Sequence, residues 1–354
     1  MENANALRDE RMPLDVISYL LAEGKASWSD VKSNLKSEGA YNLLSKSVAT
    51  IVVAASDSKN KEKADYVCDG VADEEEIELA LSELGAEDGQ VFLLEGTYHI
   101  SSPIDILKSN VALVGAGWGT KLLLDDGANC RVIIVGDNAN QYENIIIANL
   151  QIDGNKLNQS DTSHGIAIYG ASGAKILRCL ITNTYIHDCH NAGVYLKYAD
   201  YCRIVHNLLQ NNDYYGVGGG YVYYAVIAGN ELSGGGDGIY LYYTYYSVIL
   251  ANTISSCTYE GIAFIGDDSV IIGNVCEGNG QSGIALSYAS RNTIIGNRCR
   301  NNAEYGVKIL NAECDSNLIG KNYLTGNTSG AISDAGTGTI LGVFDTANNN
   351  DNVV

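Results

Sequence analysis

Apolar residues recur along the chain in short alternating runs, with a period of 22 or 23 residues over residues 193–306. Each repeat opens with a glycine followed by an apolar residue, and an asparagine later closes a second apolar run. The opening glycines are Gly193, Gly216, Gly238, Gly261, Gly283 and Gly306. The closing asparagines are Asn207, Asn230, Asn252, Asn274 and Asn297. So short a period, with no 3.6-residue spacing inside it, indicates stacked β-strands and argues against helical repeats.

Each repeat has room for three short strands. The first follows the glycine, the second ends at the asparagine, and the third comes directly after it. Asparagine tolerates the left-handed conformation that a one-residue corner needs, so we expect it to occupy the corner. Coils stacked at the strand spacing of ~4.8 Å would bury a shared core and align the asparagine amides in a ladder. The sequence therefore predicts an all-β fold, a parallel β-helix solenoid with strands of about three to five residues.

The second strand of each repeat is apolar at nearly every position. Its central isoleucine, such as Ile249, should face the core, and alternation then points Val226, Leu250, Val270 and Ile272 outward. A strand that is apolar on both faces is usually covered on both, and so long an exposed strip is unusual for a monomer. We expect a homo-oligomer, most simply a trimer, joined through this strip. Cover by the N-terminal segment or the C-terminal tail is the alternative.

The repeats resemble the right-handed parallel β-helices of the pectate-lyase-like superfamily. Residues 64–84, 89–106 and 109–124 resemble the N-terminal module of its pectate-lyase-3-like branch. In that module an Asp-Gly-x-x-Asp turn leads a short helix, a strand ends in Gly-Thr-Tyr, and a Gly-x-Gly rung follows. The branch includes phage tailspikes and other glycan-active proteins. The resemblance implies a polysaccharide partner and a virion-associated or extracellular location, but the fold hosts lyases, hydrolases, epimerases and plain binders alike.

Three segments follow from this pattern: an N-terminal helical cap or adaptor (1–50), the β-helix (51–335) and a polar tail (336–354). The N-terminus lacks the pattern of a signal peptide, and no apolar run is long enough for a membrane-spanning helix. A net charge of −20 argues against nucleic acid and against an anionic membrane surface as partners. The nine cysteines contain no Cys-x-x-Cys pair, so we expect reduced core thiols, no metal site and no cofactor.

Five tyrosines fall within the nine residues 238–246. Alternation points Tyr240 and Tyr242 out from the first strand, while Ile239 and Leu241 face the core. Aromatic rings with hydroxyl tips along a concave strip suit sugars. In the following turn, tyrosine stacking that rigidifies the chain is the favoured interpretation. The expected substrate-binding residues are Tyr169, Tyr195, Tyr240 and Tyr242, above a floor of Gly218 and Gly220.

Asp237 and Glu260 each precede the opening glycine of adjacent repeats, which places their backbones ~4.8 Å apart. Two carboxylates near this spacing can divide acid and nucleophile roles in retaining glycoside hydrolysis, in which the two carboxyl groups are about 5–5.5 Å apart. Proximity of like charges raises one pKa, as a general acid needs. Turn capping is an equally good interpretation, and the pair also offers oxygen ligands to calcium. Asp213, Lys197 and His190 are the further catalytic candidates.

Two classes of function remain. The first strands offer only Lys197 and Lys308 as the basic residue that a lyase of this superfamily usually has, whereas acidic residues suited to a tailspike-like hydrolase are present. We therefore expect polysaccharide binding and processing, more simply by hydrolysis than by elimination. The alternative is a non-catalytic glycan-binding or structural β-helix, such as a fibre or spike component.

Overall fold

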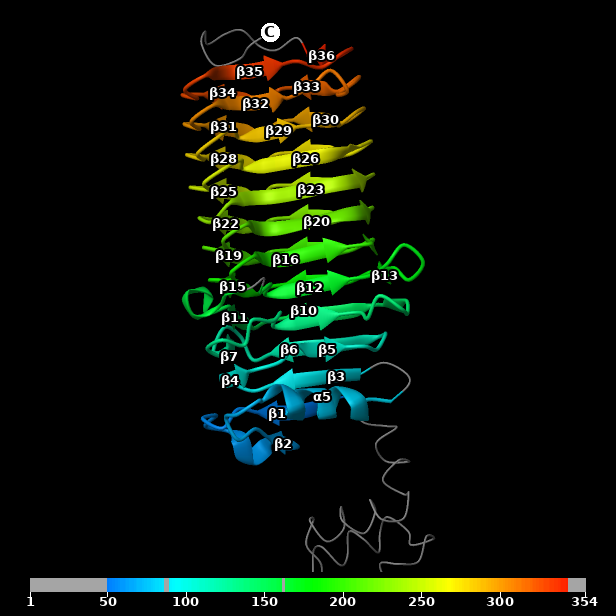
Figure 1. The fold of residues 1–354 in the computed structure, drawn as a ribbon, viewed down its shortest axis with the longest axis vertical. Helices are drawn as coiled ribbons and strands as arrows, with labels where there is room; N and C mark the ends of the chain where they lie inside the picture. The colour runs from blue at the N-terminus through cyan, green and yellow to red at the C-terminus, as the bar shows by residue number, and fades with distance from the viewer. Residues whose placement is uncertain (1–49, 86–88, 161–162, 343–354) are drawn as a thin grey trace, which may run out of the picture.

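The structure is a computed structural model that describes residues 50–85, 89–160 and 163–342. Apart from Thr50, the expected N-terminal cap lies outside the described residues, as does the tail from residue 343. Over the described residues the chain forms the predicted right-handed parallel β-helix, with its coils stacked along the long axis (Figure 1). Every coil supplies strands to three parallel sheets, which we call sheets A, B and C.

Sheet C holds the first strand of each repeat and has 13 strands. Its main strands are β5 (Ile104–Ile106), β8 (Ile133–Val135), β12 (Ile166–Tyr169), β16 (Ala192–Lys197), β20 (Tyr215–Tyr223), β23 (Asp237–Tyr245), β26 (Ile262–Asp267), β29 (Ile284–Leu286), β32 (Tyr305–Ile309) and β35 (Gly330–Asp334). At its edge lie β9 (Tyr142–Glu143), β13 (Ile176–Leu177) and β17 (Ala199–Asp200). Most strands have the predicted length, but β20 and β23 have nine residues each because they continue through the tyrosine-rich turn.

Sheets A and B hold the second and third strands of each repeat. Sheet A consists of β2 (Tyr66–Val67), β1 (Thr50–Ala54), β3 (Gly89–Leu93), β6 (Val111–Gly115), β10 (Ile145–Ala148), β14 (Leu180–Thr182), β18 (Arg203–Val205), β21 (Val226–Ala228), β24 (Val248–Leu250), β27 (Val270–Ile272), β30 (Thr293–Ile295), β33 (Leu318–Gly320) and β36 (Ile340–Leu341). Sheet B consists of β4 (Gly96–Ile100), β7 (Thr120–Leu124), β11 (Gln151–Asp153), β15 (Tyr185–His187), β19 (Leu208–Gln210), β22 (Glu231–Ser233), β25 (Thr253–Ser255), β28 (Val275–Glu277), β31 (Arg298–Arg300) and β34 (Tyr323–Thr325).

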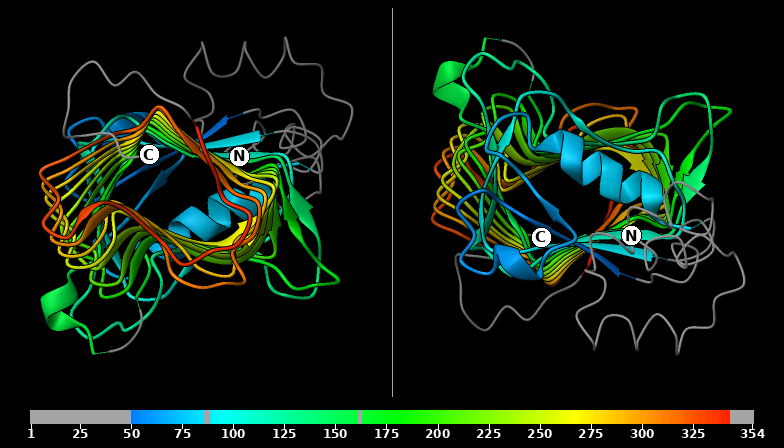
Figure 2. Two further views of the ribbon diagram at one scale, coloured as in Figure 1. Left: turned by 90° about the horizontal axis from the view of Figure 1, so that it is seen from above. Right: turned by 90° about the horizontal axis from the view of Figure 1, so that it is seen from below.

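One α-helix, α5 (Glu74–Glu83), lies across the N-terminal end of the described coils, as the resemblance implied (Figure 2). Its buried residues Ile77, Ala80 and Leu81 join the core of the coil stack. Two short 3₁₀ turns, η1 (Lys61–Lys63) and η2 (Lys156–Asn158), lie outside the stack. Among the described residues, no helix has the length and apolar character needed to span a membrane.

The glycine that opens each repeat is required by close approach between coils. A Cβ at Gly238 would lie 2.6 Å from the carbonyl oxygen of Gly261, and a Cβ at Gly261 would lie 2.6 Å from that of Gly283. Real Cβ atoms do not approach backbone oxygens so closely. The spacing of 22 or 23 residues between these glycines therefore follows from the stacking itself.

The asparagine ladder is confirmed, but the corner assignment was wrong. Asn252 is fully buried, and its Nδ2 donates to the carbonyl oxygen of Ile227 and to Asn274 Oδ1, each at 2.9 Å. The left-handed residue is the one before the asparagine, for example Ala251 with φ 52°. The asparagine is thus needed for its side-chain hydrogen bonds, and the corner falls on whichever residue precedes it.

The predicted inward residues of sheet A form the core, and Ile204, Ile249 and Ile271 are buried. The outward residues of the same strands are partly shielded by one another, and Leu250 remains 39% exposed. Cys276 and Cys299 are register partners in the core, and all nine cysteines are free thiols. The oligomer predicted through this outer face stays a prediction.

Candidate functional site

The tyrosine strip lies on the outer face of sheet C. Tyr195 of β16 is in register with Gly218 of β20, which is in register with Tyr240 of β23. The next outward column holds Lys197, Gly220 and Tyr242. Ile239 and Leu241 are buried, whereas Tyr240 and Tyr242 are half-buried, so the predicted alternation holds.

The two glycines do not form the open floor that the sequence suggested. A Cβ at Gly218 would lie 2.4 Å from Tyr215 Cδ2, and one at Gly220 would lie 2.3 Å from Tyr242 Cε2. The rings of Tyr215 and Tyr242 therefore cover the glycine positions themselves. Tyr215, which the sequence did not single out, stacks on Tyr240 with ring centroids 4.8 Å apart. The glycines serve to let aromatic rings lie flat on the sheet.

Two tyrosine hydroxyls of the strip contact each other across an intervening coil. Tyr195 and Tyr242 lie two coils apart, and their hydroxyl oxygens are 3.2 Å from each other. The ring of His164 stacks on Tyr195 with centroids 4.8 Å apart. Burial and the hydrogen bond to Tyr242 raise the pKa of Tyr195 well above its ordinary value, so its hydroxyl stays protonated. The strip is a preformed aromatic surface.

The N-terminal end of the strip is basic. Lys197 Nζ donates to the hydroxyl of Tyr169 at 3.1 Å and lies 4.5 Å from the centre of that ring. The guanidinium carbon of Arg131 lies 5.1 Å from the same ring. Two of the predicted residues, Tyr169 and Lys197, are therefore joined to each other, and Lys197 already has a partner.

Asp237 and Glu260 are brought together at the opposite edge of the strip. The backbone N–H of Glu260 donates to Asp237 Oδ1 at 2.9 Å, and the two carboxyl groups also hydrogen-bond to each other. Direct contact is closer than the spacing of about 5–5.5 Å expected for a retaining pair. The pair is instead arranged to share a proton.

Burial decides where that proton resides. Asp237 is 7% exposed, and this desolvation, together with the charge of Glu260, raises the pKa of Asp237 to about 7. Burial also raises the pKa of Glu260, but the hydrogen bond from Asp237 opposes that rise. Asp237 therefore holds the proton and Glu260 is the more acidic partner. Asp237 is the register partner of Tyr215, and Tyr215 stacks on Tyr240, so the pair lies beside the strip.

The other catalytic candidates have separate surroundings. Asp213 Oδ1 is bound by Lys156 Nζ at 2.9 Å. The backbone N–H of His190 donates to Ser163 Oγ at 3.2 Å, while His190 Nδ1 is buried and without a hydrogen-bond partner among the described residues.

The turn after the first strand is a structural ladder, as favoured from the sequence. Tyr198 stacks on Tyr221 at 4.6 Å, and Tyr221 stacks on Tyr243 at 5.0 Å. All three have left-handed backbones, with φ of 48°, 59° and 48°. Such stacking offsets part of the strain that positive φ imposes on a bulky residue.

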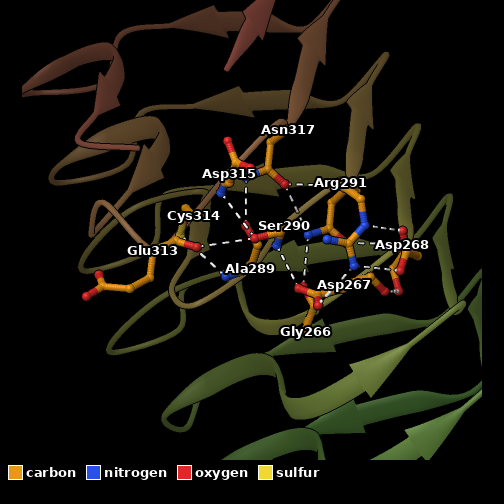
Figure 3. Close-up of polar contacts among 12 residues, drawn as sticks. Gly266, Asp267, Asp268, Ala289, Ser290, Arg291, Glu313, Cys314, Asp315 and Asn317 are labelled. Atoms are coloured by element: carbon orange, nitrogen blue, oxygen red, sulfur yellow. Dashed lines mark hydrogen bonds and ion pairs between the residues drawn. The ribbon is translucent and has the colours of Figure 1, made fainter. Parts of the chain in front are cut away.

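Further along the same edge, acidic residues are neutralised by Arg291 (Figure 3). Its Nε donates to Asp268 Oδ1 at 2.8 Å, and its Nη2 lies 3.2 Å from Asp267 Oδ2. The backbone N–H of Ser290 also donates to Asp267 Oδ1 at 2.8 Å. The guanidinium lowers the pKa of Asp268, so this carboxylate is unsuited to proton transfer. Asp267 accepts hydrogen bonds from the backbone and side chain of the neighbouring coil and so stabilises the turn.

Two groups of side chains have the spacing of metal ligands within the described residues. The first is Cys68, Asp73 and Glu76. Asp73 already accepts N–H groups from Gly70 and His99, and burial raises the pKa of the Cys68 thiol well above its usual range. A metal ion would have to displace both the thiol proton and the hydrogen bonds that Asp73 accepts, so this group is less suited to one. The second group, Asp153, His187 and Asp188, lies on sheet B.

A family model described as "Periplasmic copper-binding protein (NosD)" matches residues 113–269 and 148–341. No curated protein sequence matches the chain.

Solved structures share the fold at low identity. The A-module of mannuronan C-5 epimerase AlgE4 from Azotobacter vinelandii superposes with a TM-score of 0.56 at 17% identity, over 73% of this chain and 89% of that one. The Dettilon tailspike protein gives 0.57 at 16% identity, over 70% of this chain and 50% of its own. DFA-IIIase from Arthrobacter chlorophenolicus A6 gives 0.57 at 11% identity, over 82% and 93%. At these identities the similarity shows the fold alone.

Proposed function

The chain belongs to the family described as periplasmic copper-binding protein (NosD), and within it we propose that this member binds a polysaccharide along the tyrosine strip and hydrolyses it at Asp237 and Glu260. The observation that carries the proposal is a carboxyl pair, in which Asp237 is buried and Glu260 is partly buried, sharing a proton beside a preformed aromatic surface. A mannuronan epimerase and a tailspike among the structural neighbours support a glycan as the ligand. The family description and the tailspike support a periplasmic or extracellular location.

The proposed chemistry divides roles within the pair. With a pKa of about 7, Asp237 is about half protonated at neutral pH, and the protonated form can give its proton to the glycosidic oxygen. Glu260 then acts as the carboxylate that attacks the sugar or activates a water. Because the two groups are in contact, a bound sugar has to enter between them and part them. Tyr215 and Tyr240 would hold the adjacent sugar by stacking.

The family description names copper, and the described residues fit Cu(I) poorly. Cu(I) prefers thiolate and thioether ligands. Eight of the nine cysteines are buried, and Met1 and Met12 lie outside the described residues. The proposed hydrolysis therefore takes no step through copper.

The test is a glycan panel assayed for new reducing ends, with ultraviolet detection of unsaturated products in parallel. Wild type should release reducing ends without unsaturation, and Asp237→Asn and Glu260→Gln should each lose at least about a hundredfold of the rate. Both variants should still bind the glycan and remain folded. If wild type binds but cleaves no glycan, the protein is a glycan-binding β-helix instead. If unsaturated products appear, the reaction is an elimination and the proposed hydrolysis is wrong.

A further inference from the structure

A second polar cluster lies on sheet B. Asp153 ends β11 and His187 ends β15, and the two are register partners on adjacent coils, with Asp188 directly following. One ligand atom from each of the three lies within 4.8 Å of the other two. We propose that Asp153, His187 and Asp188 bind a divalent metal ion of the zinc class. This site is separate from the sheet C strip and does not depend on the proposed hydrolysis.

The donor set fits that class of ion. Imidazole nitrogen and carboxylate oxygen are the ligands that borderline divalent ions such as Zn²⁺ and Cu²⁺ accept, whereas Cu(I) prefers sulfur. The side chains of His187 and Asp153 are 11% and 19% exposed, and that of Asp188 is 38% exposed. The cluster is therefore largely desolvated on one side and open to an entering ion on the other.

Neighbouring groups hold the imidazole in place. His187 Nδ1 lies 2.7 Å from Asp188 Oδ2, and Nε2 lies 2.8 Å from the side-chain nitrogen of Gln151. The ring of Tyr185 stacks on the imidazole with centroids 4.4 Å apart. A bound ion would replace the contact between His187 and Asp188. Gln151 and Tyr185 would remain as outer contacts, of the kind that orient metal-binding histidines and are worth about 10–100-fold in affinity. A histidine fixed in this way loses little freedom on binding an ion.

Two lysines now neutralise the carboxylates and would compete with the metal. Lys121 Nζ lies 2.8 Å from Asp153 Oδ2, and Lys156 Nζ lies 4.0 Å from Asp188 Oδ1 and 2.9 Å from Asp213 Oδ1. Three carboxylates thus face two ammonium groups, which leaves the cluster net negative. Lys121 is 31% exposed and has a long flexible stem, so it can leave Asp153 for water. Its removal should favour the metal.

Trp118 provides a local reporter. Its ring lies 5.5 Å from Tyr185, which in turn stacks on His187. The chain has two tryptophans, so a Trp28→Phe variant leaves Trp118 as the single indole fluorophore. Cu²⁺, used as a paramagnetic probe, should quench this fluorescence to saturation at one ion per chain, and Zn²⁺ should reverse the quenching by competition.

Variants in the Trp28→Phe background identify the ligands. His187→Ala and Asp153→Asn should each weaken Cu²⁺ binding at least about tenfold. His99→Ala is the matched control, since His99 Nδ1 also lies beside a carboxylate, 2.9 Å from Asp125 Oδ1, and it should leave binding unchanged. Lys121→Ala should tighten binding several-fold, which a merely structural role would not produce. Equal affinity in the His187 variant, or unchanged affinity in the Lys121 variant, would overturn the proposal.

Discussion

At the scale of single residues, the Asp237–Glu260 pair differs from the other acidic residues at the edges of the strip because it holds a proton. Asp267 and Asp268 are neutralised by Arg291, and Asp213 by Lys156. Asp237 has no cation described beside it, and burial is the largest influence on its pKa. A protonated carboxyl near neutral pH is what a general acid requires.

The raised pKa of Asp237 predicts a pH-dependent cost to stability. The folded state holds this proton more tightly than the unfolded chain, so the stabilisation is complete below about pH 4 and is lost as pH rises through about 7. A difference of one pKa unit between the folded and unfolded chains corresponds to about 1.4 kcal/mol of stability. Melting temperatures should therefore fall in wild type relative to Asp237→Asn across this range.

Glu231→Gln, which changes an exposed carboxylate on sheet B, is the control and should follow wild type. Parallel curves for wild type and Asp237→Asn would show that Asp237 is ionised in the fold at all these pH values.

At the scale of elements, the asparagine ladder joins successive coils more specifically than the apolar core does. Asn252 accepts from the backbone N–H of Asn230 at 3.0 Å and donates onward to Asn274. Each asparagine therefore completes hydrogen bonds on the coils before and after it. An apolar residue in that position would leave several buried groups unpaired.

Asn252→Ala should lower the free energy of unfolding by about 3 kcal/mol or more, because each abandoned buried partner costs about 1–3 kcal/mol. The measurement is the midpoint of denaturant unfolding. Thr253→Ala, at the exposed neighbouring position, should shift it little. A loss below about 1 kcal/mol for Asn252→Ala would mean that water replaces the ladder.

Sequence periodicity predicted the elements well because glycine close approach and the asparagine ladder both impose the coil length. It missed a second ladder, in which Asn279 Nδ2 donates to Asn302 Oδ1 at 2.9 Å. These two asparagines are 23 residues apart, but neither follows an apolar run. The signal that identified the first ladder was therefore missing. The nine-residue strands β20 and β23 were also missed, because tyrosine is compatible with both a strand and a turn.

The register of the candidate residues on sheet C was predicted, but their side-chain contacts were not. The phase of the glycines placed Asp237 beside Glu260, and it placed Tyr195 and Tyr240 in one column with Gly218 between them. Backbone register does not determine side-chain rotamers. The position of the Tyr215 ring over Gly218 and the hydrogen bond from Lys197 to Tyr169 were therefore not predicted. These contacts depend on packing between coils, which a single repeat does not specify.

At the scale of the whole molecule, the outer face of sheet A is the surface that we most expect to be covered by a partner. It is a long apolar strip on a chain whose net charge is −20, and Ile340 and Leu250 on its strands are 60% and 39% exposed. Such a strip suits association between copies of the chain, because apolar burial would overcome the repulsion between like-charged copies.

We predict a trimer joined through this face. Replacing Leu250 and Ile272 together by aspartate should release monomers. The melting temperature should be unchanged if the monomer is stable without its partners. Light scattering at micromolar concentration measures the mass. A monomeric wild type would contradict the prediction and would require a cover from the same chain.

The central claim is that the glycan lies on the tyrosine strip of sheet C, and the affinity of one oligosaccharide for three proteins tests it most directly. In calorimetry with the Glu260→Gln background, Tyr240→Ala should weaken binding several-fold, because one stacked ring contributes on the order of 1 kcal/mol. Tyr245→Ala removes a ring that stacks equally well, 5.0 Å from Tyr223, but in the turn, and should change affinity less than about twofold. If Tyr240→Ala leaves the affinity unchanged and only lowers the melting temperature, the strip is a stability ladder and the account is wrong.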